Sequence, residues 1–162
     1  LRSITSALWL NSEIVRSGDL MTNIAKATRR IHGVEIGPKV RGLLVQMSEE
    51  AGRLVRLASD ASGEQDVGLA AALDDIDDSL DDLNKETTQA IFEAHNEDGL
   101  ELQPAVQLAL ICRYYERIGD HAVNMGERVQ YMVQGWLPEH TGAVRAAARV
   151  SADVGARELD SE

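Results

Sequence analysis

The chain has 162 residues, a formal net charge of −11 and an isoelectric point near 4.8. This length is enough for one domain with its own core, and an acidic chain repels phosphate backbones, so direct nucleic-acid binding is not expected. Aromatic residues make up only 4% of the chain, which favours an aliphatic core of packed helices over a sheet. No apolar run is long enough to insert into a membrane, and the single cysteine, Cys112, is typical of a reduced, cytoplasmic protein.

Proline and glycine divide the sequence into four helical stretches, expected at about 4–31, 38–58, 66–94 and 104–134. Within the last three, apolar residues recur in alternating steps of three and four, as at Leu69, Leu73, Ile76 and Leu80. This pattern is the seam of long helices that pack at shallow angles. No segment alternates with period two, and short connections favour antiparallel neighbours. The sequence therefore predicts an all-α, antiparallel helical bundle.

The two ends of the chain differ from the predicted bundle. Residues 137–162 contain many Ala, Val and Arg but no Ile, Phe or Met, so we expect a flexible tail, with a short helix near 144–150 as the alternative. The first residue is Leu1, and the sequence reads from there as the inside of a helix. We therefore expect a fragment that lacks an N-terminal piece.

A short internal repeat occurs at an offset of 101 residues. Four residues recur with identical spacing: Arg16, Gly18, Asp19 and Asn23 match Arg117, Gly119, Asp120 and Asn124. The second copy follows two predicted helices and the first copy follows none. A duplicated architecture with about two helices missing from the first unit is therefore expected.

Two pairs of carboxylates have i, i+4 spacing, Asp77 with Asp81 and Glu116 with Asp120, so each pair lies on one helix face. Counted from the turn near residue 98, Asp81 lies 17 residues before and Glu116 lies 18 after. Asp77 lies 21 before and Asp120 lies 22 after. Antiparallel packing would place both pairs at the same height, and Asn124 adds an amide oxygen one turn further on.

Four carboxylates at one height repel each other unless a cation lies among them. Hard oxygen ligands suit magnesium, calcium, manganese or iron, so one hypothesis is a divalent or multinuclear metal site. The other is a solvated acidic face, which the spacing alone favours because residues 74–82 contain six aspartates. His121 points about 100° away from Asp120 around the helix, and we expect it at the surface or facing a partner. No catalytic motif is present, and no catalytic residue is predicted.

The segment Tyr115-Glu-Arg-Ile-Gly-Asp-His-Ala-Val-Asn-Met-Gly-Glu127 closely resembles the signature helix of the PhoU family of phosphate-signalling regulators. Residues 77–83 resemble the family's acidic motif, and residues 16–23 resemble its first signature helix. The resemblance implies a duplicated three-helix bundle. Residues 1–33 would be the last helix of an incomplete first repeat, and residues 34–136 the complete second repeat.

The resemblance also implies a function without catalysis. It implies a cytoplasmic negative regulator of the phosphate-starvation response, often homodimeric, that links the ATPase of a phosphate ABC transporter to a sensor histidine kinase. Two alternatives stay open, a carboxylate-bridged metal-dependent enzyme and a purely structural dimerisation bundle.

Some members of the family bind metal clusters. The resemblance therefore implies ligation of iron, zinc, manganese or magnesium by Asp77, Asp81, Glu116 and Asp120, with Asn124 as a further ligand. Asp19 and Asn23 would form an incomplete second site, because Val15 stands where the first copy would need the counterpart of Glu116.

Overall fold

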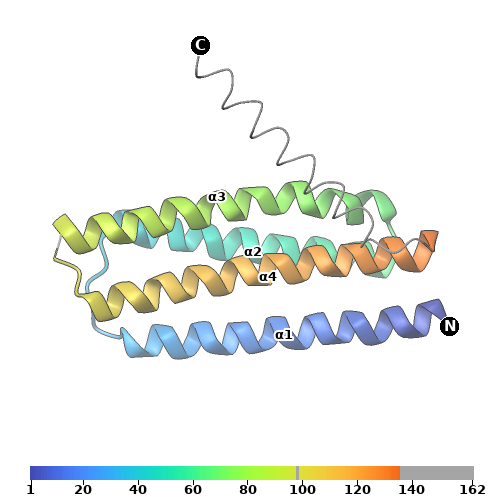
Figure 1. The fold of residues 1–162 in the computed structure, drawn as a ribbon, viewed down its shortest axis with the longest axis horizontal. Coiled ribbons are helices and arrows are strands. Elements are labelled where there is room, and N and C mark those ends of the chain that lie inside the picture. The colour runs from blue at the N-terminus through green and yellow to red at the C-terminus, as the bar shows by residue number, and fades with distance from the viewer. Residues whose placement is uncertain (98, 136–162) are drawn as a thin grey trace, which may run out of the picture.

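The computed structural model describes residues 1–97 and 99–135. Over these residues the chain forms four α-helices and no strand: α1 (Arg2–Arg30), α2 (Pro38–Glu64), α3 (Val67–Glu97) and α4 (Leu102–Gln134). Figure 1 shows that these helices are long and that each runs opposite to the helix before it in the chain. The predicted all-α, antiparallel bundle is confirmed. The tail predicted for residues 137–162 lies outside the described residues.

The predicted end of the second helix near residue 58 is wrong, because α2 continues to Glu64. The serine-containing segment does not stop the helix, since Ser62 Oγ donates a hydrogen bond to the carbonyl of Ala58 and Ala61 is fully buried. The helix ends where Gln65 adopts a left-handed conformation with φ of 54°. The third helix likewise runs three residues past its predicted end, to Glu97.

Most of the predicted seam residues form one core that all four helices share, whereas Leu69 packs on a smaller cluster of Ala61, Ala70 and Val129. Its largest members are completely buried: Met47, Leu54, Leu73, Leu80 and Leu108. Burying a side chain of this size contributes about 1.5–3 kcal/mol. Tyr115 is only partly buried against this core. None of the described helices has the length and apolar character needed to cross a membrane.

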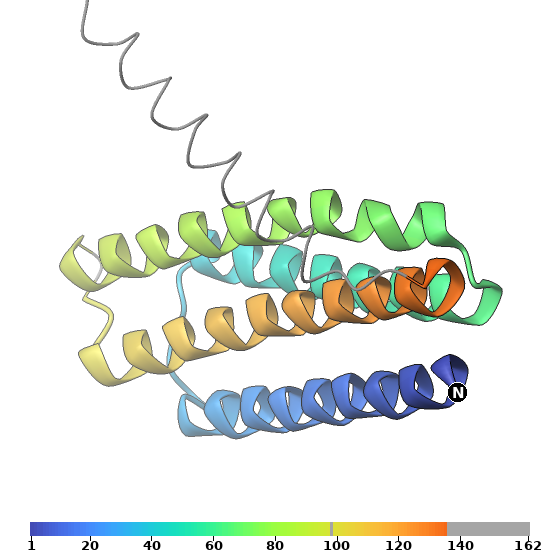
Figure 2. The same ribbon diagram turned by 45° about the vertical axis from the view of Figure 1, so that its right-hand side comes forward.

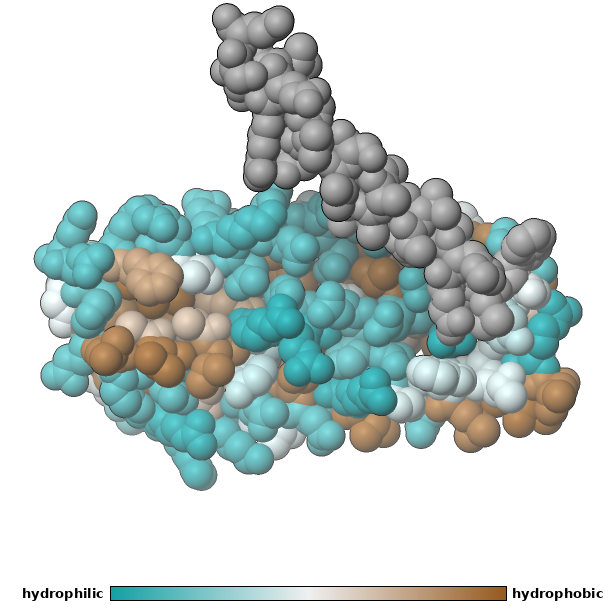
Figure 3. All heavy atoms as spheres, in the orientation of Figure 1, coloured by the Kyte–Doolittle hydropathy of each residue, from teal (hydrophilic) through white to brown (hydrophobic). Residues whose placement is uncertain are grey.

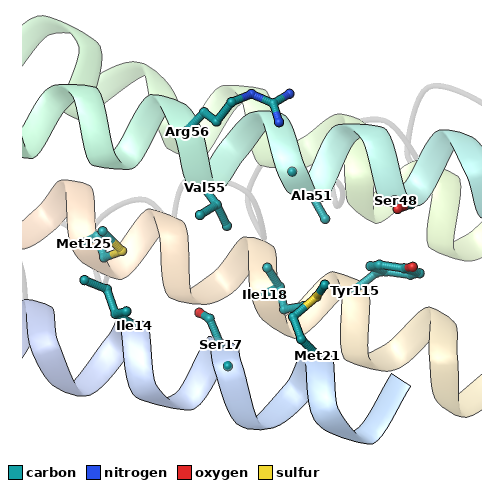
Figure 4. A pocket seen from close by; sticks show the side chains of 12 residues that line it. Ile14, Ser17, Met21, Ser48, Ala51, Val55, Arg56, Tyr115, Ile118 and Met125 are labelled. Atoms are coloured by element: carbon teal, nitrogen blue, oxygen red, sulfur yellow. The ribbon is translucent and has the colours of Figure 1, made fainter. Parts of the chain in front are cut away.

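The central element is α4, which contacts each of the other three helices. In contrast, α1 packs against α4 alone among the described helices, as Figure 2 shows. Its outer face therefore stays exposed, with Ile4, Leu8 and Val15 between 54% and 67% accessible, and Ile14 and Met21 on its flank are 56% and 54% accessible. A cavity of about 390 Å³ is lined by side chains of α1, α2 and α4, among them Ile14, Met21 and Val55 (Figure 4).

Candidate functional site

An acidic cleft of about 380 Å³ opens between α3 and α4. The α3 wall carries four aspartates, and the α4 wall carries Asp120, Val123 and Asn124. Four of the five predicted ligands line this cleft, namely Asp77, Asp81, Asp120 and Asn124. The hairpin count from the sequence thus corresponds to the register in which α3 and α4 pack.

The fifth predicted ligand, Glu116, does not line the cleft. Its carboxylate pairs with the guanidinium of Arg113, less than one turn earlier on α4. Glu116 still lies close enough to the cleft to raise the pKa of Asp77. Glu116 therefore lies at the edge of the cleft, paired with Arg113.

Asp77 lies in the most constrained part of the cleft. Burial first, and then the carboxylates of Asp81, Asp120 and Glu116, raise the pKa of Asp77 to about 7. Its Oδ1 atom is buried and has no hydrogen-bond partner. Such an atom costs about 1–3 kcal/mol when nothing compensates it. Either a proton or a cation would therefore stabilise the Asp77 carboxyl group.

The neighbouring carboxyl groups feel the same environment. Burial and the nearby Asp120 raise the pKa of Asp81, while Lys85 opposes this rise. Burial and Asp120 also raise the pKa of Glu116, while Arg113 lowers it. Each group holds its negative charge less readily than it would in water because several carboxylates share one partly dehydrated cleft.

The close approach of the two helices depends on Gly119. A Cβ atom at this position would overlap Oδ1 of Asp77 and would lie 2.8 Å from Cδ2 of Leu80. Gly126, two turns further along α4, repeats this contact, because its Cβ would lie 2.7 Å from the carbonyl oxygen of Ala70. The absence of these two side chains lets α3 lie directly on α4 and holds Asp77 against it.

A family model described as the PhoU domain matches residues 44–129, more than half of the chain. The chain belongs to the PhoU family. The matched residues contain α3, most of α4 and the whole acidic cleft, so the residues of the cleft fall inside the PhoU domain.

Curated relatives extend the match to most of the chain. It is 36% identical over 139 residues to phosphate-specific transport system accessory protein PhoU homolog 1 of Mycobacterium tuberculosis, which covers 85% of this chain and 62% of that protein. It is 33% identical over 135 residues to PhoU homolog 1 of Thermotoga maritima, which covers 83% of this chain and 58% of that protein. The chain thus spans about six tenths of the length of these relatives.

The fold is also shared with a solved structure. The phosphate transport system regulatory protein PhoU from Streptococcus pneumoniae superposes with a TM-score of 0.75 at 23% identity, over 85% of this chain and 64% of that one. At this identity the likeness establishes the PhoU helical bundle as the fold.

The donor set of the cleft fits a hard divalent cation. Carboxylate and amide oxygens, which line the cleft, are the ligands that such cations prefer, and the buried Oδ1 of Asp77, which lies against Gly119, has no hydrogen-bond partner. Within residues 1–97 and 99–135, however, no three His, Cys, Asp or Glu side chains stand in a metal-ligating arrangement. The cleft therefore contains suitable oxygen ligands, but they are not arranged in the geometry of a coordinated metal ion.

The prediction for His121 is wrong, because this side chain is buried and only 6% exposed. Its Nδ1 lies 2.6 Å from Oε2 of Glu13, which is itself 2% exposed. Nδ2 of Asn124 donates to the same oxygen at 3.4 Å. The face of α4 that bears His121 is covered by α1. The sequence alone did not show which face of α4 would be covered.

The incomplete second site stays incomplete among the described residues. Asp19 is exposed and Asn23 is half-buried on α1. Since α1 packs against α4 alone, no helix brings aspartates to Asp19 in the way that α3 does for Asp120. Glu13 is the functional candidate that the sequence did not suggest, because a glutamate on a polar helix gives no sign of burial.

Proposed function

We propose that this chain is a regulatory accessory protein of phosphate uptake that acts by docking to other proteins. The observation that carries the proposal is its 36% identity, over 85% of the chain, to a protein named as an accessory of phosphate-specific transport. In the finer form of the proposal, it is a cytoplasmic negative regulator that links the ATPase of a phosphate ABC transporter to a sensor histidine kinase.

The chemistry of the cleft supports docking over catalysis. It offers carboxylates and one amide, while the histidine of the same helix is turned away toward Glu13. A metal-dependent hydrolase needs a base beside an open coordination position. The described cleft residues include no histidine, and their carboxylates are the groups that would hold the metal, so the cleft favours docking over the enzyme alternative.

Deletion of the gene tests the regulatory role. We expect genes of phosphate starvation to be expressed in phosphate-rich medium after deletion, and to be repressed again when the intact gene is returned. Co-purification with the transporter ATPase or the kinase would support the finer form. Unchanged repression in the deletion strain would contradict the proposal.

We propose further that the cleft binds a divalent cation through Asp77, Asp81, Asp120 and Asn124, and that Glu116 joins after it leaves Arg113. The Nδ2 of Asn124 is directed at Glu13, which leaves the amide oxygen as the ligating atom. A bound cation would neutralise the repulsion that raises the pKa of Asp77.

Elemental analysis of protein purified without chelator would identify iron, zinc, manganese or magnesium. Asp77→Asn should lower the bound metal, and the matched control Asp60→Asn, an exposed aspartate on α2, should not. Equal metal content in both variants would contradict the proposed cation site and would not affect the regulatory proposal.

We also propose that α1 is the last helix of one PhoU repeat and that α2 to α4 form the next, over residues 34–136. The contrast between Gly18 and Gly119 supports this. A Cβ at Gly18 would meet nothing within 4 Å, whereas its counterpart on α4 is pressed against α3. The exposed outer face of α1 fits a homodimer of the chain, which analytical ultracentrifugation would test.

A further inference from the structure

A cluster of exposed apolar side chains lies near the connection between α3 and α4. Four large residues are accessible there: Phe92 at 59%, Leu102 at 65%, Val106 at 48% and Leu110 at 37%. Figure 3 shows apolar residues gathered at this end of the face that it displays. Contiguous exposed apolar surface is characteristic of protein–protein contact, and neither the metal site nor the core uses these side chains.

The register of α3 on α4 brings these residues together. Gly119 faces Asp77 and Leu80 across the two helices. Val106 lies 13 residues before Gly119, and the same shift along α3 from residues 77–80 leads to residues 90–93, which include Phe92. On α4, the other two lie one turn before and one turn after Val106. The apolar patch therefore consists of Phe92, Leu102, Val106 and Leu110.

The apolar patch and the acidic cleft share one face of the hairpin. Val106 lies 14 residues before Asp120, which is about 21 Å along the axis and about 40° around it. Phe92 lies 11 residues after Asp81, which is about three turns and about 20° of rotation. A straight segment lying along α3 and α4 would therefore meet apolar side chains first and carboxylates later.

The acidic end stays negative even when a cation is bound. Residues 74–82 contain six aspartates, and Asp120 faces them across the cleft. Among nearby cations, Lys85 pairs with Asp82 and Arg113 pairs with Glu116. One divalent ion would cancel only two of these charges. The face is thus apolar at one end and anionic at the other.

We propose that this face binds an amphipathic helix of a partner protein, with large apolar residues at one end and Lys or Arg about 14 residues away. Apolar anchors would fill the patch, and the basic end would lie over the acidic cleft. The proposal gives the docking role a location and rests on that role. Peptide binding and gene regulation are measured separately, so the two can fail independently.

Two synthetic 18-residue helical peptides test it, one with three leucines before four lysines and one in the reverse order. Fluorescence anisotropy against the full chain should show binding of at least one, weaker at higher salt. Phe92→Ser and Val106→Ser should each weaken it at least tenfold. Val45→Ser should have no effect, because Val45 is equally exposed at 52% but lies on α2.

Several outcomes would overturn the proposal: no binding of either peptide, binding that survives Val106→Ser, or equal binding of peptides with glutamate in place of lysine. Sedimentation of Val106→Ser provides a further check. If that substitution converts a dimer to a monomer, the patch is covered by a second copy and not by a basic helix. Circular dichroism of each variant would verify that the bundle is intact.

Discussion

The two copies of the repeated motif differ in what lies opposite them. On α4, Gly119 is pressed against α3, and Asp120 faces the aspartates of that helix. On α1, a Cβ at Gly18 would meet nothing within 4 Å, and Asp19 is exposed. The same residues with the same spacing therefore form a cleft in one place and an open surface in the other. The site is made by the helix that packs against the motif.

The largest effect on stability is expected at the buried contact between α1 and α4. Glu13→Ala removes the carboxylate that the buried ring of His121 contacts and that accepts from the amide of Asn124, between α1 and α4. We expect a loss of about 3 kcal/mol in the free energy of unfolding, measured by urea denaturation. Arg16→Ala serves as control, because its guanidinium is exposed and lies 3.7 Å from Glu13. Equal losses in both variants would mean that the buried contact has no special role.

The glycines give the sharpest matched pair. Gly119→Ala would overlap the carboxylate of Asp77 and crowd the buried side chain of Leu80, so both side chains must shift, at a cost of about 1–3 kcal/mol. Gly18→Ala meets open space and should stabilise α1 by about 0.5–1 kcal/mol, because alanine favours the helix. Thermal unfolding of both variants would measure the difference. Equal effects of the same sign would mean that the two copies are equivalent.

The charge of Asp77 should make stability depend on pH. Its pKa is about 7 in the folded chain and 3.8 in the reference state, so ionisation is unfavourable to the fold. The cost is complete above pH 7 and is relieved as the pH falls from 7 toward 4. Without added metal, Asp77→Asn should therefore stabilise the chain by about 1–2 kcal/mol at pH 8, less at pH 5. A constant difference between pH 5 and pH 8 would exclude this ionisation as the cause.

The smallest effect concerns the exposed end of the α1–α4 contact. The guanidinium of Arg128 lies over the ring of Trp9, 4.1 Å from its centroid. A cation–π contact at an exposed site contributes about 0.5–1 kcal/mol. Arg128→Gln should lower the free energy of unfolding by this amount in wild type, and by nothing in a Trp9→Leu background. A double-mutant cycle measures this, and additive losses would show that the two side chains do not interact.

Much of the fold followed from local pattern. The three-and-four spacing around Leu73, Ile76 and Leu80 predicted the seam, and the hairpin count predicted that Asp77 and Asp81 would meet Asp120. Both depend only on residues near in sequence or joined by a short turn. The α2 end was missed because Ser62 satisfies its hydroxyl within the helix, which composition alone does not show.

What the sequence could not predict depends on contacts distant in the chain. The burial of His121 depends on Glu13, 108 residues earlier, and on the face that α1 presents to α4. The pairing of Glu116 with Arg113, which keeps Glu116 out of the cleft, depends on the side-chain conformations of both residues. Neither a packing face nor a rotamer is set by residue spacing.

The most direct test of the difference between the two copies is calorimetric titration of manganese into the chain and into two variants. If the helix opposite the motif makes the site, manganese binds the wild type, Asp77→Asn abolishes the binding heat, and Asp19→Asn leaves it unchanged. Binding that survives Asp77→Asn, or that disappears in Asp19→Asn, would contradict the assignment of the site to the cleft between α3 and α4.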